Sequence, residues 1–214
     1  MAKRPTNQFN KNRSSKEFRK QLAKSDKVEF SKLRTACTKF ELLESVRKSF
    51  CFVLNVMVCV AAKQIMLQDD SNNNQSTSTD DIKLLAQIEP NLINRHLDIS
   101  NLWKFMQMDE LKDHEIFKTT QAYGNKNQKN SHLTYTLVQK LVEVDNVMRH
   151  SPYNKIQNGE QYDHFMNILN ECYNPFKDMS IKLNPVLPLL FPNSKRIKMM
   201  IKSTFKRLKK DLNN

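Results

Sequence analysis

The chain has 214 residues, and 35 Lys and Arg against 22 Asp and Glu give it a formal net charge of +13. The excess lies at the two ends. Residues 1–50 hold fourteen basic and five acidic side chains, and residues 195–214 hold eight basic and one acidic. The residues between them hold 13 basic and 16 acidic side chains, so the middle is close to neutral. This distribution indicates a neutral body with two basic ends, rather than a uniformly basic surface.

Glycine is nearly absent, since Gly124 and Gly159 are the two that the sequence contains. A phosphate-binding loop, a dinucleotide fingerprint or a nucleophile elbow needs several glycines in a short window, because the backbone there approaches a ligand closely or takes positive φ. The sequence excludes these motifs. Tight hairpin turns also favour glycine, so a many-stranded sheet is disfavoured and helices are expected.

The four cysteines are far apart and form no Cys-x-x-Cys pair: Cys37, Cys51, Cys59 and Cys172. This usage is typical of a reducing compartment, and the polar N-terminus shows no secretory leader. We therefore expect an intracellular protein whose thiols are small buried hydrophobic groups.

With 39% hydrophobic residues the chain can bury one core. We expect an all-α fold, an irregular bundle of about six to eight helices in a single domain. The domain is expected at 14–192, with a disordered basic arm at 1–13 before it, a flexible polar loop at 69–81 within it and a basic amphipathic helix at 193–214 after it.

Two capping boxes mark the first predicted helices. Ser14 with Glu17 three residues later predicts a basic amphipathic helix that begins there. Thr38 with Glu41 predicts the start of the most apolar helix, which runs to about residue 67. A separate helix over 27–37 is expected to join it through a bend.

The apolar stretch from Phe50 to Ala62 raises the question of a membrane. Its length as a helix is about 20 Å, against the roughly 30 Å of a bilayer core. Lys48 and Lys63 flank it. We interpret it as a buried core helix, and a membrane is not an expected partner.

Polar loops and prolines divide the rest of the chain. A short helix is predicted over 82–88, and a longer one from Asp98 to Gly124, in one or two pieces. Apolar residues three and four apart predict a helix over 133–148, with a strand as the alternative for 133–137. A helix over 160–173 is expected to stop at Pro175.

The stretch VLPLLFP, over 186–192, is predicted to be extended because of its prolines. Two interpretations are open. It is either a connector that lies on this chain's own core, or a segment that docks into a groove of a partner protein. The candidate partner-binding residues are Val186, Leu187, Leu189, Leu190 and Phe191.

No spacing of residues indicates catalysis or a metal site. Zinc ligands are usually paired within two to four residues, and no such pair of His and Cys is present. Asp109, Glu110, Asp113 and Glu115 with His114 are a candidate site for a divalent cation, but their spacing is also typical of a solvated helix face, which is the interpretation that we prefer. We therefore expect neither an enzyme nor a cofactor, although folding can bring distant carboxylates together.

The basic ends favour nucleic acid as a partner, because each phosphate contact of a Lys or Arg releases counterions. No recognition-helix, zinc-finger or RNA-binding signature is present, so the contacts are expected to be with the backbone and without sequence specificity. The candidate residues are Lys3, Arg4, Lys11, Arg13, Lys16, Arg19, Lys20, Lys195, Arg196, Lys198, Lys202, Lys206, Arg207, Lys209 and Lys210.

Three other interpretations of the basic ends are open. In the first, the C-terminal stretch is an amphipathic helix that docks on the body by its apolar stripe and leaves its basic face to solvent. The stretch from Lys195-Arg196 to Lys210 matches a bipartite nuclear import signal. The helical body would then be a module or adaptor that binds partner proteins, and the charge would serve import and solubility. A helix attracted to anionic lipid is the third interpretation.

A small chain that is rich in Lys and Asn, helical and without catalytic motifs is similar, in composition alone, to accessory or capsid-associated proteins of nuclear DNA viruses and to small subunits of ribonucleoprotein assemblies. This resemblance implies a structural, nucleic-acid-associated protein of the nucleus, in a nucleocapsid or ribonucleoprotein, with both nucleic acid and proteins as partners.

Overall fold

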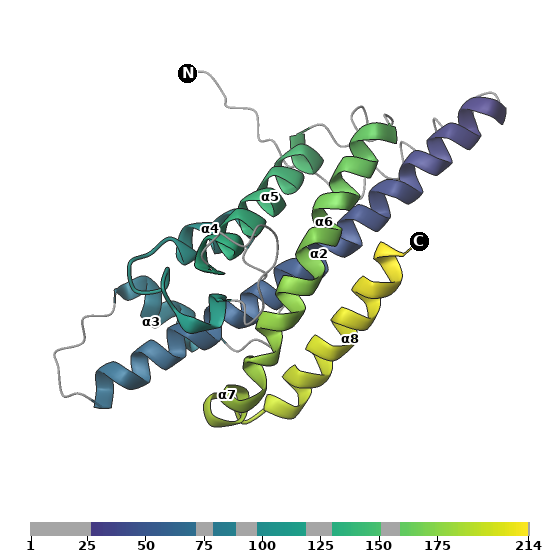
Figure 1. Cartoon of the computed structure of the whole chain (residues 1–214). Helices are drawn as coiled ribbons and strands as arrows, with labels where there is room; N and C mark the ends of the chain where they lie inside the picture. The colour runs from purple at the N-terminus through teal and green to yellow at the C-terminus, as the bar shows by residue number, and fades with distance from the viewer. Residues whose placement is uncertain (1–26, 72–78, 89–97, 119–129, 151–158, 214) are drawn as a thin grey trace, which may run out of the picture.

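A computed structural model describes residues 27–71, 79–88, 98–118, 130–150 and 159–213. Within these residues the fold is all-α, with seven α-helices, one 3₁₀ helix and no strand (Figure 1). The predicted all-α bundle is confirmed. The predicted helix at residue 14 and the arm at 1–13 lie outside the described residues.

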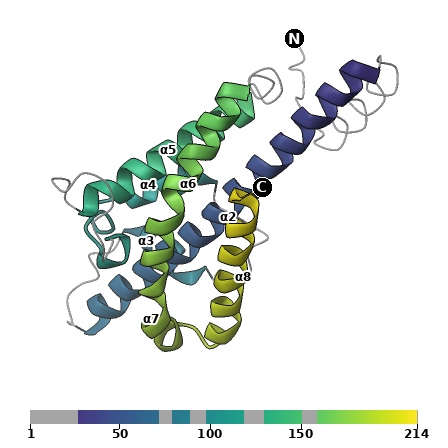
Figure 2. The ribbon, with the colours of Figure 1, turned by 45° about the vertical axis from the view of Figure 1, so that its right-hand side comes forward.

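The central element is α2 (Lys27–Ser71), a helix of 45 residues whose length is about 67 Å. Every residue from Phe50 to Ala62 is buried, because α3, α4, α6, α7 and α8 all pack against α2. Figures 1 and 2 show α2 running through the molecule with the other helices around it. A helix that is apolar on all sides is typical of such a central position.

The expected bend near Thr38 is wrong, since α2 continues through this position without interruption. No Pro or Gly occurs between residues 27 and 71, so nothing in this stretch breaks the backbone hydrogen bonds of a helix. Thr38 and Glu41 fit a capping box, but they lie inside the helix.

Part of α2, Cys37–Asp69, is long and apolar enough to cross a membrane by length and composition. Of its most apolar 18-residue window, 72% is buried inside the protein. A helix with this share of its surface buried is typical of a protein core, as predicted from the sequence for residues 50–62.

The short helices α3 (Asp80–Gln87) and α4 (Ile99–Met106) follow close to the predicted positions. The Asp98 carboxylate caps α4, because its Oδ1 accepts a hydrogen bond from the Asn101 N–H at 2.8 Å. Turns lead from α4 to the 3₁₀ helix η1 (Glu115–Phe117), so the longer predicted helix is divided into two pieces. Its predicted end at Gly124 lies outside the described residues.

Helix α5 (Asn130–His150) confirms the helical interpretation of this segment over the strand. Helix α6 (Gly159–Ile181) extends beyond its predicted end, and Pro175 lies inside it. The predicted stop is wrong for a local reason. Proline removes one hydrogen bond, here to the carbonyl of Glu171, and Glu171 is exposed to solvent. Burial of Phe176, the next residue, and of Met179, one turn after Pro175, favours continuation of the helix.

The stretch over 186–192, predicted to be extended, is helical as far as Leu190, and its next residue, Phe191, is extended. Helix α7 (Leu183–Leu190) has Pro185 as its third residue, where a backbone N–H has no acceptor within the helix. Pro188 removes a hydrogen bond to the carbonyl of Asn184, which is exposed to solvent. Leu183, Leu187 and Leu190 are buried, so the apolar face of α7 is held by the core.

Candidate nucleic-acid interface

Helix α8 (Ser194–Leu212) is the predicted basic amphipathic helix. Its apolar side chains Ile197, Ile201, Phe205 and Leu208 are buried against α2, α6 and α7. The Phe205 ring lies edge-on to Tyr173 of α6, with 5.9 Å between ring centroids. Figures 1 and 2 both show α8 at the edge of the bundle, so its other side faces outward.

Two side-chain bonds fix the rotation of α8 on α2. Ser45 Oγ donates a hydrogen bond to the Asp211 carboxylate at 2.9 Å. The Arg207 guanidinium donates to Ser49 Oγ, also at 2.9 Å. These bonds hold one flank of α8 against α2 near its C-terminal end. Of the candidate residues in α8, Arg207 is therefore partly engaged within the protein.

A row of lysines follows the opposite flank of α8. Its members are spaced three, four, four and three residues apart, which places them on one side of a helix over a distance of about 21 Å. Four of the five are exposed and Lys198 is half-buried. We call this set the lysine row: Lys195, Lys198, Lys202, Lys206 and Lys209.

No lysine of this row has an ion-pair partner among the residues that the structure describes. Elsewhere basic side chains are paired with acids, as in Lys83 with Asp80 and Lys140 with Glu171. The one acid of α8 is Asp211, which accepts the hydrogen bond from Ser45. The positive charge of α8 is therefore available to an external anion.

The first turn of α8 carries Lys195 and Arg196 and no acidic residue. This is the positive end of the helix dipole, where a cation costs about 0.3–1 kcal/mol and an acid would stabilise. Lys195 and Arg196 at these positions therefore do not stabilise α8 through the helix dipole.

The other predicted positions are placed as follows. Lys3 to Lys20 lie outside the described residues, so the structure places only the C-terminal set of the predicted basic residues. In the candidate partner segment, Leu187, Leu190 and Phe191 are buried in this chain's own core. The Lys63 ammonium lies 4.5 Å from the centroid of the Phe191 ring. Val186 is half-buried, and Leu189 is 81% exposed.

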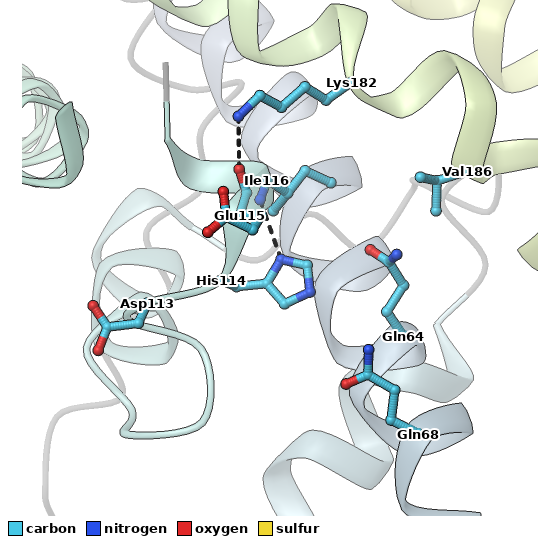
Figure 3. A pocket seen from close by; sticks show the side chains of 8 residues that line it. All are labelled: Gln64, Gln68, Asp113, His114, Glu115, Ile116, Lys182 and Val186. Atoms are coloured by element: carbon cyan, nitrogen blue, oxygen red, sulfur yellow. Dashed lines mark hydrogen bonds between the residues drawn. The ribbon is translucent and has the colours of Figure 1, made fainter. Parts of the chain in front are cut away.

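A pocket of about 390 Å³ lies between α2, η1 and α7, and the sequence did not indicate it. Figure 3 shows that His114, Glu115 and Lys182 line one side of it and that Gln64 and Gln68 line the other. Lys182 Nζ donates hydrogen bonds to the carbonyls of Glu115 at 2.9 Å and Lys118 at 2.5 Å. Because these residues are 64 to 67 positions apart, the pairing was not readable from sequence spacing.

The polar groups of this pocket act within the protein. His114 Nδ1 accepts the Ile116 N–H at 3.2 Å and so caps η1. Burial lowers the pKa of His114 below its usual 6.5. Lys182 bonds η1 to the start of α7. The arrangement holds η1 on the body.

The described residues contain no group of three or more His, Cys, Asp and Glu side chains that could hold a metal ion. Burial raises the pKa of Cys59 and of Cys172 to about 12 in each case. Thiols in that state are poor nucleophiles at neutral pH.

No protein-family model, curated protein or solved structure matches this chain.

Proposed function

We propose that the protein is a structural or accessory component of a nucleic-acid assembly, such as a nucleocapsid or ribonucleoprotein. It binds phosphate backbones without sequence specificity through its basic termini. The observation that carries the proposal is the lysine row of α8, because its lysines are unpaired among the described residues. Each lysine that contacts a phosphate releases counterions, so affinity comes from charge and not from base contacts.

The burial of the apolar face of α8 supports nucleic acid over a lipid surface as the partner. A helix that lies on a membrane inserts its apolar face between the lipids. In α8 that face is already packed on the body, with Ile197 1% and Leu208 0% exposed. A phosphate backbone needs only the outward basic face, which leaves the packing of α8 unchanged.

The alternative function, a helical module that binds partner proteins, has less support from the described residues. Its candidate segment contributes Leu187, Leu190 and Phe191 to the core, where a partner cannot reach them without unfolding α7. Leu189 is exposed, but single exposed hydrophobic residues are common on protein surfaces.

The test is a salt titration of binding to a fluorescent mixed-sequence DNA duplex, using the full chain. With about eight phosphates engaged, log affinity should fall against log salt concentration with a slope near −7. A flat titration, or binding to phosphatidylserine vesicles as tight as to the duplex, would overturn the proposal.

A matched pair of variants locates the site. In the first, Lys195, Lys202, Lys206 and Lys209 of α8 are changed to Gln. In the second, four lysines away from α8 are changed to Gln: Lys83 of α3, Lys104 of α4, Lys140 of α5 and Lys112 in the turns after α4. Both variants lose the same net charge. The α8 variant should reduce the steepness of the slope by about 3 to 4 units, and the control should change it by less than about 1. Equal effects of the two variants would contradict a site on α8.

A further inference from the structure

The outward side of α8 carries positive charge on both of its flanks. At 100° per residue the lysine row lies along one flank, and two residues, Arg196 and Arg207, lie along the other. Arg207 also donates a hydrogen bond to Ser49 of α2. Between the flanks the crest of the helix carries Met199, which is 66% exposed, Ser203 and the exposed Lys210. Positive charge on both flanks of one helix fits an anion with two parallel lines of phosphates better than an anion with one.

No aromatic ring lies on this outward side. Phe205 is the one aromatic residue of α8, and it is 7% exposed and in contact with Tyr173. Proteins that bind single strands gain much of their affinity from bases stacked on aromatic side chains. Without aromatic rings on its outward side, α8 can gain binding affinity there only from charge contacts. Charge contacts release more counterions from a duplex, about 0.9 per contact, than from a single strand, about 0.7.

The width of an α-helix favours a B-form DNA duplex over an A-form RNA duplex. An α-helix with its side chains is about 10–12 Å wide, and the major groove of B-form DNA is about 12 Å wide. The major groove of A-form RNA is too narrow and deep for side chains to read. The lysine row is about 21 Å long, which corresponds to about six base pairs at 3.4 Å each.

We propose that α8 lies along the major groove of a B-form DNA duplex, with the lysine row on the phosphates of one strand and Arg196 and Arg207 on those of the other. Met199, Ser203 and Lys210 face the floor of the groove. The inference rests on the proposed function, because it names the class of nucleic acid that the same site takes.

The first experiment compares three probes of one sequence with the full chain: a DNA duplex, an RNA duplex and a single DNA strand. We expect the DNA duplex to bind at least about tenfold more tightly than either other probe at about 150 mM salt. Equal affinities for the three probes would overturn the groove placement and leave the proposed function standing. Absence of binding to all three would overturn the proposed function itself.

The second experiment places the helix in the groove. Guanine N7 lies in the major groove, so α8 bound there should protect it from methylation. Met199→Glu puts a negative charge on the crest, and Leu189→Glu puts the same charge on α7 at a position that is 81% exposed. We expect M199E to lose about tenfold or more in duplex affinity and L189E less than about threefold. Unprotected guanine N7 in a saturated complex, or equal losses in the two variants, would overturn the placement.

Discussion

Arg47 of α2 and Asp145 of α5 form an ion pair inside the bundle, with 2.7 Å between Nη1 and Oδ1. The Asp145 side chain is completely buried, and that of Arg47 is 16% exposed. The pair joins two helices that are almost a hundred residues apart in the chain, and it lies beside the apolar stripe of α5 that includes Leu141 and Val144.

Removing one member of this pair should strongly destabilise the protein. Arg47→Met removes the cation that pairs with the buried Asp145 carboxylate, and breaking a buried ion pair in this way typically costs about 3–5 kcal/mol. Urea denaturation followed by circular dichroism measures the free energy of unfolding. The double variant Arg47→Met/Asp145→Leu replaces the pair by apolar groups and should recover most of the loss. If the double variant is less stable than Arg47→Met alone, the pair does not act as described.

Reversing the charge of the first turn of α8 should raise stability and weaken binding. Lys195→Glu with Arg196→Glu puts acids at the positive end of the helix dipole, and we expect a gain of about 0.5–2 kcal/mol in the free energy of unfolding at low salt. Duplex affinity should fall in the same variant because two phosphate contacts become repulsive. Thermal denaturation and anisotropy titration check the two effects. A loss of stability would contradict the argument from the dipole.

Stability should fall as the pH falls below about 6.5, in part because of His114. Burial lowers the pKa of His114 in the folded protein from the 6.5 of the unfolded chain. Below pH 6.5 the unfolded chain therefore takes up a proton that the folded protein does not, so the free energy of unfolding decreases. Above pH 6.5 His114 is neutral in both the folded protein and the unfolded chain, so its contribution to the free energy of unfolding no longer changes with pH.

The matched variant for this effect is His114→Asn, which keeps an acceptor for the Ile116 N–H but does not titrate. Its free energy of unfolding, measured by urea denaturation from pH 7.5 to pH 5, should depend less on pH than that of the unchanged protein. Equal slopes for the two proteins would show that His114 does not contribute.

The buried thiols should be inert while the protein is folded. The pKa of Cys59 and that of Cys172 are each raised to about 12, so thiolate is negligible at pH 8. Iodoacetamide followed by mass spectrometry should modify Cys37, which is half-buried, well before these two. All four should react at similar rates in urea. Rapid modification of Cys59 in the folded protein would contradict its position in α2.

The sequence alone determined the fold class and the chemical character of α8. Apolar residues three and four apart recur through the chain, and that spacing is a local property that needs no tertiary partner to be visible. The scarcity of glycine excluded phosphate loops in the same way. The lysine row was also visible, because a regular helix converts sequence spacing directly into a face.

Only the tertiary structure decided where the local rules fail. Pro175 and Pro188 cost helix stability locally, but burial of Phe176, Met179 and Leu187 against other helices outweighs the lost hydrogen bonds. Asp145 is buried because an arginine from α2 meets it, and nothing in the α5 sequence shows that partner. The residues that pair across the fold are distant in the chain. Their contacts therefore depend on how the helices pack, which no short window of sequence contains.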